Sequence, residues 1–360
     1  MHHQPSPQQL LLLQASLFSG DKALKAWEMW SQDIDFDTID PASYKLLPLV
    51  SRNPALQMLK DPLFEKCKGI YQQVWVTNQL NWHKMRSFLC QMPGVNKIVL
   101  LKGIAMILHY YNDFGVRILG DIDIFLERAE AISLTPFLRK EGWKAAPFSR
   151  FDITNRDHLN RWHALNFTHA SGLHLDLHWS FIEENIHLLD EAVLNEAVPF
   201  FPPLYVPSAT DLFIQICVHG MKPSKVPLIR WIPDAVILLR QGDIHWERFI
   251  ELAEKSHLSK LLSLALSYLA KEFEVPIPVT ALEKLSRISP LRLESLEYWC
   301  HGKNYSPFAA WCRYFLNHQY FTLWDQLIHI PHYVQVTARL KSPWHVPLFV
   351  LYWPLKRIIT

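Results

Sequence analysis

Two short stretches of the chain decide its fold. Residues 99–103 read Val-Leu-Leu-Lys-Gly, and residues 117–124 read Arg-Ile-Leu-Gly-Asp-Ile-Asp-Ile. The first is an apolar run that stops at Lys-Gly, which predicts a buried strand ending at a tight turn. Apolar side chains then recur at helical spacing from Ile104 to Tyr111, and a second strand is predicted over residues 121–126. The two strands and the helix between them form a frame into which the other predicted elements can be placed.

The second strand opens with alternating carboxylate and apolar residues. Because side chains alternate across a strand, Asp121 and Asp123 are predicted to share one face. Two neighbouring carboxylates repel each other and a bound cation removes that cost, so the pair predicts a metal site. The alternative is a polar strand edge that only contributes solubility. Repulsion also predicts that replacing either aspartate leaves the metal-free protein at least as stable.

Two further strands are predicted over residues 162–168 and 173–179, joined by an Ala-Ser-Gly turn. In the later strand, His174, Asp176 and His178 alternate with apolar residues and therefore share a face. Asp176 lies beside the first two aspartates if the strands are neighbours in the sheet. The histidines carry a weaker signal, because such a histidine is more often hydrogen-bonded within a core than catalytic.

The composition describes a folded chain without a strong preference for charged partners. Of its 360 residues, 49% are apolar and 19% are charged, which excludes disorder and leaves room for two or three domains. The net charge is +2 and no lysine- and arginine-rich stripe alternates with aromatics, so a nucleic-acid partner is not expected. Five cysteines without a Cys-x-x-Cys pair indicate reduced thiols and a cytoplasmic location.

Signals for export or membrane insertion are also missing from the sequence. No basic segment followed by an apolar core opens the chain, and no apolar run approaches the roughly 18 residues of a spanning helix. The apolar, aromatic stretch 344–355 precedes Lys356 and Arg357, which is compatible with peripheral contact to a membrane surface. A packed terminal segment is the favoured interpretation of that stretch.

Hydrophobic periodicity divides the chain into a helical region over residues 1–93, an α/β core over 94–205 and a second helical region over 206–360. Helices are predicted at residues 8–18, 23–30, 61–92 (as one helix or two), 129–141, 208–220, 232–239 and 246–269 (again as one or two). A run of alternating aspartates at residues 33–37 has no strand-and-turn frame around it. That run is therefore predicted to form a polar loop and helix caps.

The frame resembles the DNA polymerase beta-like nucleotidyltransferase superfamily, and within it a poorly characterised family with a Leu-Lys-Gly … Arg … Gly-Asp-Ile-Asp pattern. The matching residues are Leu101-Lys102-Gly103, Arg117 and Gly120-Asp121-Ile122-Asp123. The strand with Asp176-Leu177-His178-Trp179 is similar to a later strand of that family, and so is the stretch from Arg230-Trp231 to Asp234. The resemblance covers roughly residues 10–270 and implies an α+β fold, with a small mixed sheet flanked by helical regions.

The resemblance also implies a chemistry. Asp121 and Asp123 would hold Mg²⁺ against the phosphates of a nucleoside triphosphate, and Asp176 would hold a second ion or act as base on the acceptor. Mn²⁺ would be able to substitute. Lys102, Gly103 and Arg117 would contact the phosphates. This chain departs from much of the superfamily because Ile104, not serine or glycine, follows Gly103.

Three functions remain open at this point. The first is a Mg²⁺-dependent transferase that moves a nucleotidyl or phosphoryl group to a hydroxyl or phosphate of a small molecule, sugar or peptide. The second is a glycosyltransferase, because Asp-x-Asp also binds the metal of a nucleotide sugar; this reading needs a dinucleotide-type α/β domain before the motif. The third is a non-catalytic nucleotide-binding scaffold. No P-loop, Gly-x-Gly-x-x-Gly or Gly-x-Ser-x-Gly motif supports another chemistry.

Overall fold

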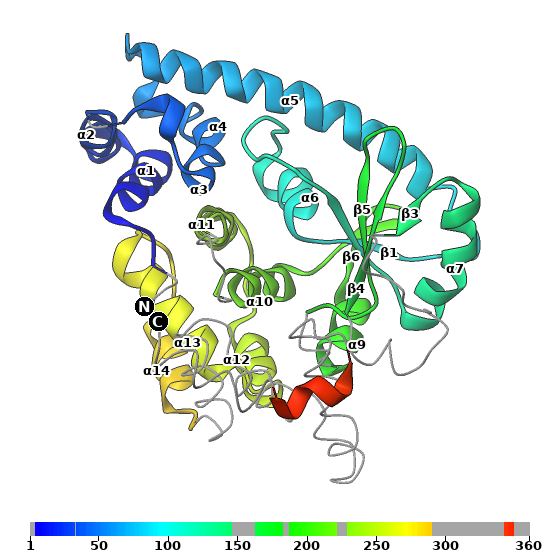
Figure 1. Ribbon diagram of the computed structural model, residues 1–360. Coiled ribbons are helices and arrows are strands. Elements are labelled where there is room, and N and C mark those ends of the chain that lie inside the picture. Colours follow the sequence, from blue (N-terminus) through cyan, green and yellow to red (C-terminus); the bar gives the residue numbers. More distant parts are fainter. Residues whose placement is uncertain are drawn as a thin grey trace. The chain divides into compact units, whose positions relative to one another are not determined.

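The computed structural model describes residues 4–32, 34–145, 163–182, 187–221, 229–289 and 342–348 (Figure 1). Contacts within the chain define two compact units, one of residues 3–287 and one of residues 1–2 and 288–360. The first unit contains the sheet and every predicted site residue. The predicted region boundaries at residues 93 and 205 both fall inside this unit and remain a prediction.

Helices precede the sheet, as the periodicity predicted. α1 (Pro7–Leu17) and α2 (Gly20–Ser31) pack against each other. Four short helical turns follow: η1 (Phe36–Thr38), α3 (Pro41–Tyr44), α4 (Leu47–Val50) and η2 (Pro54–Leu56). The predicted helix over residues 61–92 forms one continuous helix, α5 (Pro62–Leu89).

Polar side chains fix where these helices begin. Asp61 accepts a 2.8 Å hydrogen bond from the backbone N–H of Leu63 and another of 2.8 Å from the indole of Trp27, which ties α2 to the start of α5. Asp35 accepts a 3.1 Å bond from the backbone of Asp37 at the start of η1. The prediction of caps and loop for residues 33–37 is thereby confirmed for its described part, since residue 33 lies outside it.

One mixed sheet of seven strands, in the order β3-β4-β5-β2-β1-β7-β6, follows the helical region. The strands are β1 (Ile98–Leu100), β2 (Ile122–Phe125), β3 (Lys144–Ala145), β4 (Ala164–Thr168), β5 (His174–His178), β6 (Val198–Phe201) and β7 (Leu204–Val206). β2 lies between β1, its antiparallel neighbour, and β5, its parallel neighbour. All residues of β1 and β2 are buried. The predicted α+β class with a mixed sheet is confirmed.

Three of these strands were not predicted: the two-residue strand β3, and the strands β6 and β7. β7 pairs with β1 in parallel, and the N–H of Ile98 donates a 2.8 Å bond to the carbonyl of Pro203. β6 and β7 are short, and prolines at positions 199, 202 and 203 interrupt the alternation of side chains typical of a strand. A proline cannot donate to a strand ladder, so the sequence there lacks the usual signature of a strand.

The helix after β1 begins two residues earlier than predicted. α6 (Lys102–Met106) starts directly at Lys102 and continues into a π-helical turn, η3 (Ile107–Tyr111). Lys102 has a φ of 48°, in the left-handed region that residues with a side chain rarely adopt. Strain of this kind is concentrated at functional sites and persists only where surrounding contacts hold it.

Helices cover the sheet and continue the chain beyond it. They are α7 (Arg128–Lys140), α9 (His187–Glu196), α10 (Ala209–Gly220), α11 (Trp231–Gln241), α12 (Trp246–Lys255), α13 (Ser259–Glu272) and α14 (Val279–Arg287). Figure 1 shows α6, α10 and α11 on one side of the strands and α7 on the other. Ser208 caps α10 by accepting a 3.2 Å bond from the N–H of Asp211.

Helix α10 is packed so closely against the start of α11 that its last residue has to be small. A Cβ atom added at Gly220 would lie 2.0 Å from Cγ of Trp231. α10 also contacts α6, so it joins the turn after β1 to the first residues of α11. Side chains from both helices therefore reach the same region of the sheet.

In the stretches that the structure describes, no helix has both the length and the apolar character needed to cross a membrane. Of the predicted apolar segment 344–355, the structure describes residues 344–348. The first two of these belong to the short helical turn η4 (Pro343–His345). The rest of that segment lies outside the described residues.

Candidate metal and nucleotide site

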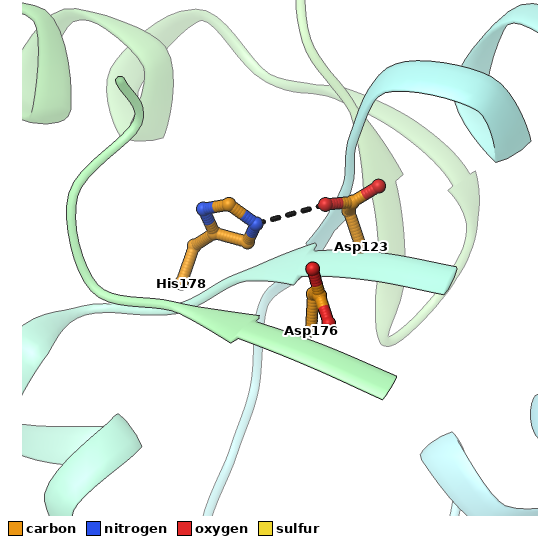
Figure 2. Close-up of side chains that lie close together, drawn as sticks. All are labelled: Asp123, Asp176 and His178. Carbon is orange, nitrogen blue, oxygen red and sulfur yellow. Dashed lines mark hydrogen bonds and ion pairs between the residues drawn. The ribbon is translucent and has the colours of Figure 1, made fainter. Parts of the chain in front are cut away.

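Asp123 and Asp176 lie side by side on the sheet. They occupy paired positions on the parallel strands β2 and β5, so their side chains lie on the same face. His178 is two residues further along β5 and shares that face, and Figure 2 shows its ring directed toward Asp123. The expectation that Asp176 joins the first motif when the strands are neighbours is confirmed by this pairing.

Asp123 is buried, and one of its carboxylate oxygens contacts two side chains. Its Oδ1 accepts a 2.6 Å bond from Nζ of Lys102 and lies 2.9 Å from Nε2 of His178. Burial by itself would raise the pKa of Asp123, but Lys102 and His178 outweigh burial and hold the pKa well below its usual range. Asp123 is therefore an anion in the folded protein. The left-handed backbone of Lys102 places its ammonium group at this carboxylate.

Asp176 has the opposite electrostatic character. Burial, together with the negative charges of Asp123 and Asp121, raises the pKa of Asp176 to about 7. Its carboxylate accepts a short hydrogen bond from the side-chain amide of Asn166 on β4, the strand on the other side of β5. The same face thus carries more negative charge than Lys102 alone can neutralise.

Asp121 lies one residue before β2 and stays exposed to solvent. Partial desolvation by the surrounding protein and the charge of Asp123 raise the pKa of Asp121. Its side chain contributes to the wall of the site without belonging to the most tightly gathered group of ligand atoms. The predicted metal role of Asp121 stays a prediction.

The residues present fit a divalent cation. Asp123, Asp176 and His178 each offer one ligand atom, and these atoms lie within 4.8 Å of one another. Two carboxylate oxygens and an imidazole nitrogen are donors found in metal sites of many enzymes. The raised pKa of Asp176 points the same way, because a cation would compensate the negative charge that causes it. Sequence reasoning had placed His178 on the correct face but had treated it mainly as a core residue.

Arg117 is held by a carboxylate from a distant helix. Its Nε and terminal nitrogen donate to both oxygens of Asp234 on α11, at 2.9–3.1 Å, and the hydroxyl of Tyr111 donates to Asp234 at 2.9 Å. Asp234 is buried and Arg117 is largely buried, and this bidentate geometry is the strong form of the pair. Arg117 reaches the site, but much of its hydrogen-bonding capacity is used within the protein. Its predicted phosphate contact is untested.

Gly103 provides room for that arginine. A Cβ atom at Gly103 would lie 2.1 Å from a terminal nitrogen of Arg117 and 2.8 Å from Cδ2 of Leu119. The close approach that this glycine permits is therefore an approach of the Arg117 guanidinium. Access of a phosphate to the Gly103 backbone, which the resemblance implies, remains a prediction.

All of these groups line one cavity of about 380 Å³. The six predicted site residues are among its lining residues: Lys102, Gly103, Arg117, Asp121, Asp123 and Asp176. His178, Asn166, Gln215, His219, Arg230 and Asp234 also line it. The chain thus brings together, around one cavity, residues from the sheet, from α6, from α10 and from the start of α11.

Gln215 and Asn166 are site residues that sequence reasoning did not identify. Gln215 accepts a 3.3 Å bond from the N–H of Lys102 and donates a 2.9 Å bond to the carbonyl of Phe181, so it braces the turn after β1. The available signal was a lone glutamine inside the apolar run Leu-Phe-Ile-Gln-Ile-Cys of α10. Asn166 carried no signal beyond its position on a strand next to β5.

Comparison with known protein families gives a match over the part of the chain that holds the site. The model of a family described as uncharacterised nucleotidyltransferase matches residues 55–274, which is more than half of the chain and includes every residue of the site. No curated protein matches significantly, and no solved structure does.

Proposed function

The chain belongs to the uncharacterised nucleotidyltransferase family, and from this premise we propose that it is a metal-dependent nucleotidyltransferase. The donor is a nucleoside triphosphate, and the acceptor is a hydroxyl or phosphate of a small molecule, sugar or peptide. The observation that carries the proposal is the gathering of Asp123, Asp176 and His178 on adjacent strands inside a cavity.

Each residue of the cavity has a role in this proposal. Asp123 and Asp176 hold Mg²⁺, with His178 and Asp121 beside them. When bound, the ion supplies charge neutralisation and orientation for the phosphates of the donor. Lys102 keeps Asp123 ionised and presents a positive charge beside the metal position. An imidazole also suits transition metals, so Mn²⁺ and Zn²⁺ belong in any test of the metal.

Asp176 has a second proposed task. This task is an alternative to metal binding: without a metal the pKa of Asp176 is about 7, so where Asp176 does not hold the ion it can receive a proton near neutral pH, as a base that activates an acceptor hydroxyl must. The sheet and the Asn166 amide hold this carboxylate in place. An orientation fixed in this way favours in-line attack on the α-phosphate, with pyrophosphate leaving.

The glycosyltransferase alternative is not favoured by the architecture. That reading needs a dinucleotide-type α/β domain ahead of the Asp-x-Asp motif, whereas the described residues before β1 form helices. The scaffold alternative predicts nucleotide binding without turnover. It is separated from the proposal by a direct assay of pyrophosphate release.

The test measures thermal unfolding of the full chain against nucleoside triphosphates and nucleotide sugars, with Mg²⁺, Mn²⁺, Zn²⁺ or a chelator. A ligand that binds the folded state raises the melting temperature by mass action. The variant is Asp123→Asn. The matched control is Asp211→Asn, because Asp211 is also a buried carboxylate, paired with Arg248 at 2.8 Å, yet it does not line the cavity.

A metal-dependent shift with one triphosphate that is lost in Asp123→Asn and kept in Asp211→Asn supports the proposal. The same triphosphate is then incubated with a small-metabolite fraction as acceptor, and pyrophosphate release is measured. Shifts with nucleotide sugars alone would favour the glycosyltransferase, and binding without pyrophosphate release would favour the scaffold. The absence of any shift would refute the proposal.

A further inference from the structure

The cavity has a basic region in addition to its carboxylates. Arg117, which precedes β2, and Arg230, at the start of α11, both line it. The guanidinium of Arg117 is close enough to lower the pKa of Arg230, and Asp234 lies in the first turn of the helix that follows Arg230. The cavity therefore presents anionic metal ligands and guanidinium groups to the same space.

The two arginines are engaged very differently. Arg117 is neutralised by a bidentate ion pair with Asp234. Arg230 donates a 2.8 Å bond from one terminal nitrogen to the backbone carbonyl of Ile118, and no ion pair joins it to a carboxylate within the described stretches. Once Arg117 and Asp234 are paired, Arg230 contacts no carboxylate among the described residues, and Asp121 acts on its charge only from a distance.

A guanidinium that contacts no carboxylate of the described residues is costly in this position. Burial and the positive charge of Arg117 lower the pKa of Arg230 to about 10, even though Asp234 and Asp121 act in the opposite direction. Lys45, at the end of α3, adds to the excess: partial burial and the charge of Arg230 lower its pKa as well. Arg230 is half-buried, and a charge that is partly withdrawn from water is normally paired, so an anion bound in the cavity would be stabilised beside it.

We propose that Arg230 binds the terminal phosphates of the donor while the metal cluster holds the phosphate nearer the sugar. This inference rests on the proposed function and deepens it, because it makes the polyphosphate chain the part of the donor that is recognised. The planar fork of arginine matches the geometry of phosphate oxygens. Arg117 then acts as a positioning residue that, with Asp234, holds the wall of the cavity.

A ranking of ligands follows from this assignment. A polyphosphate can reach the metal cluster and Arg230 at once, because both line the same cavity of about 380 Å³. Inorganic phosphate can satisfy one of the two positions only. Affinity in the presence of Mg²⁺ should therefore rise from phosphate to pyrophosphate to tripolyphosphate, whatever base the natural donor carries.

The experiment is a calorimetric titration of the full chain with inorganic tripolyphosphate and Mg²⁺, repeated with the best triphosphate of the thermal panel. The variants are Arg230→Gln, which removes the charge, and Arg230→Lys, which keeps the charge but removes the fork. The matched control is Arg240→Gln: Arg240 lies near the other end of α11, donates a 2.7 Å bond to the carbonyl of Leu17 and does not line the cavity.

The expected result is wild-type affinity in Arg240→Gln, a loss of about 10- to 100-fold in Arg230→Gln, and an intermediate loss in Arg230→Lys. Arg230→Lys also keeps the test decisive if Arg230→Gln does not fold. Wild-type affinity in every folded Arg230 variant, with binding abolished in Asp123→Asn, would overturn the role of Arg230 and leave the proposed function standing. A wild-type protein that binds neither tripolyphosphate nor any triphosphate would overturn both.

Discussion

Asp123 and Asp176 occupy paired positions on neighbouring parallel strands, yet their surroundings drive their pKa values in opposite directions. Lys102 and His178 contact Asp123 and keep it ionised. Burial and the charges of the other carboxylates act on Asp176 and raise its pKa, so it is more easily protonated than an ordinary aspartate. This asymmetry within one pair makes the two residues respond differently to pH and to substitution.

Asp176 should make the metal-free protein less stable as the pH rises. The pKa of Asp176 is about 7 in the folded state and near 3.8 in an unfolded chain, so the folded state binds more protons between these values. Its contribution to the free energy of unfolding is present below about pH 4 and is lost as the pH rises through 7.

Asp176→Asn should remove that pH dependence. In chelator, the variant should exceed wild type by about 1–3 kcal/mol at pH 8 and by much less at pH 4, after allowance for solvent screening. Urea denaturation across this pH range measures the difference. A constant difference between the two proteins would show that Asp176 titrates normally.

Asp123→Asn should lower the stability of the metal-free protein. From carboxylate repulsion alone, the sequence predicted no loss of stability for this variant. In the structure, however, Asp123 is the counter-ion of Lys102 and the partner of His178. Removing one member of a buried pair leaves the other uncompensated, so we expect a loss of about 2–4 kcal/mol in the free energy of unfolding. Urea denaturation in chelator tests this. Equal stability of the variant and wild type would show that carboxylate repulsion dominates at this position.

Gly103→Ala should destabilise the protein, although alanine favours helices. The added methyl group would collide with the Arg117 guanidinium and with Leu119, and the strain should cost about 1–3 kcal/mol. Gly120→Ala is the matched control, because Gly120 lines the same cavity and a Cβ atom there meets nothing within 4 Å. The melting temperatures of both variants, compared with that of the wild type, test this prediction. A Gly103→Ala variant as stable as Gly120→Ala would mean that Arg117 moves aside freely.

The pair of Arg117 and Asp234 should show strong coupling in a double-mutant cycle. Arg117→Met and Asp234→Asn should each cost about 3–5 kcal/mol, because each leaves a buried charge without its partner. The double variant should lose less than the sum, with a coupling of about 1–3 kcal/mol. Chemical denaturation of the four proteins measures it. Additive losses would indicate that the two side chains stabilise the fold independently.

The core of the fold was predictable from local patterns. Alternation of aspartate with isoleucine placed β2 and its buried carboxylate, and alternation of histidine, aspartate and leucine placed β5. Period two is a property of the backbone itself, so these residues could be assigned to faces before any contact was known. The same reasoning placed His178 on the face of the site.

Contacts that depend on distant chain segments were not predictable in this way. The partner of Arg117 is 117 residues away on α11, and no local pattern connects the two positions. The left-handed backbone of Lys102 has no signature, because lysine is not a residue type associated with that conformation. Prolines obscured the strand pattern of β6 and β7, which join the sheet through the pairing of β7 with β1.

One amide on the longest helix has a consequence for how this protein can be dissected. Asn78 is buried in α5, and its side-chain nitrogen donates to the carbonyls of Phe114 (2.6 Å) and Arg117 (2.8 Å). Helix α5 thereby holds the loop that contains Arg117, and Asp234 on α11 binds the side chain of the same arginine. A fragment trimmed to the sheet would lose both supports, so the smallest excisable piece that retains the site extends from α5 through α11.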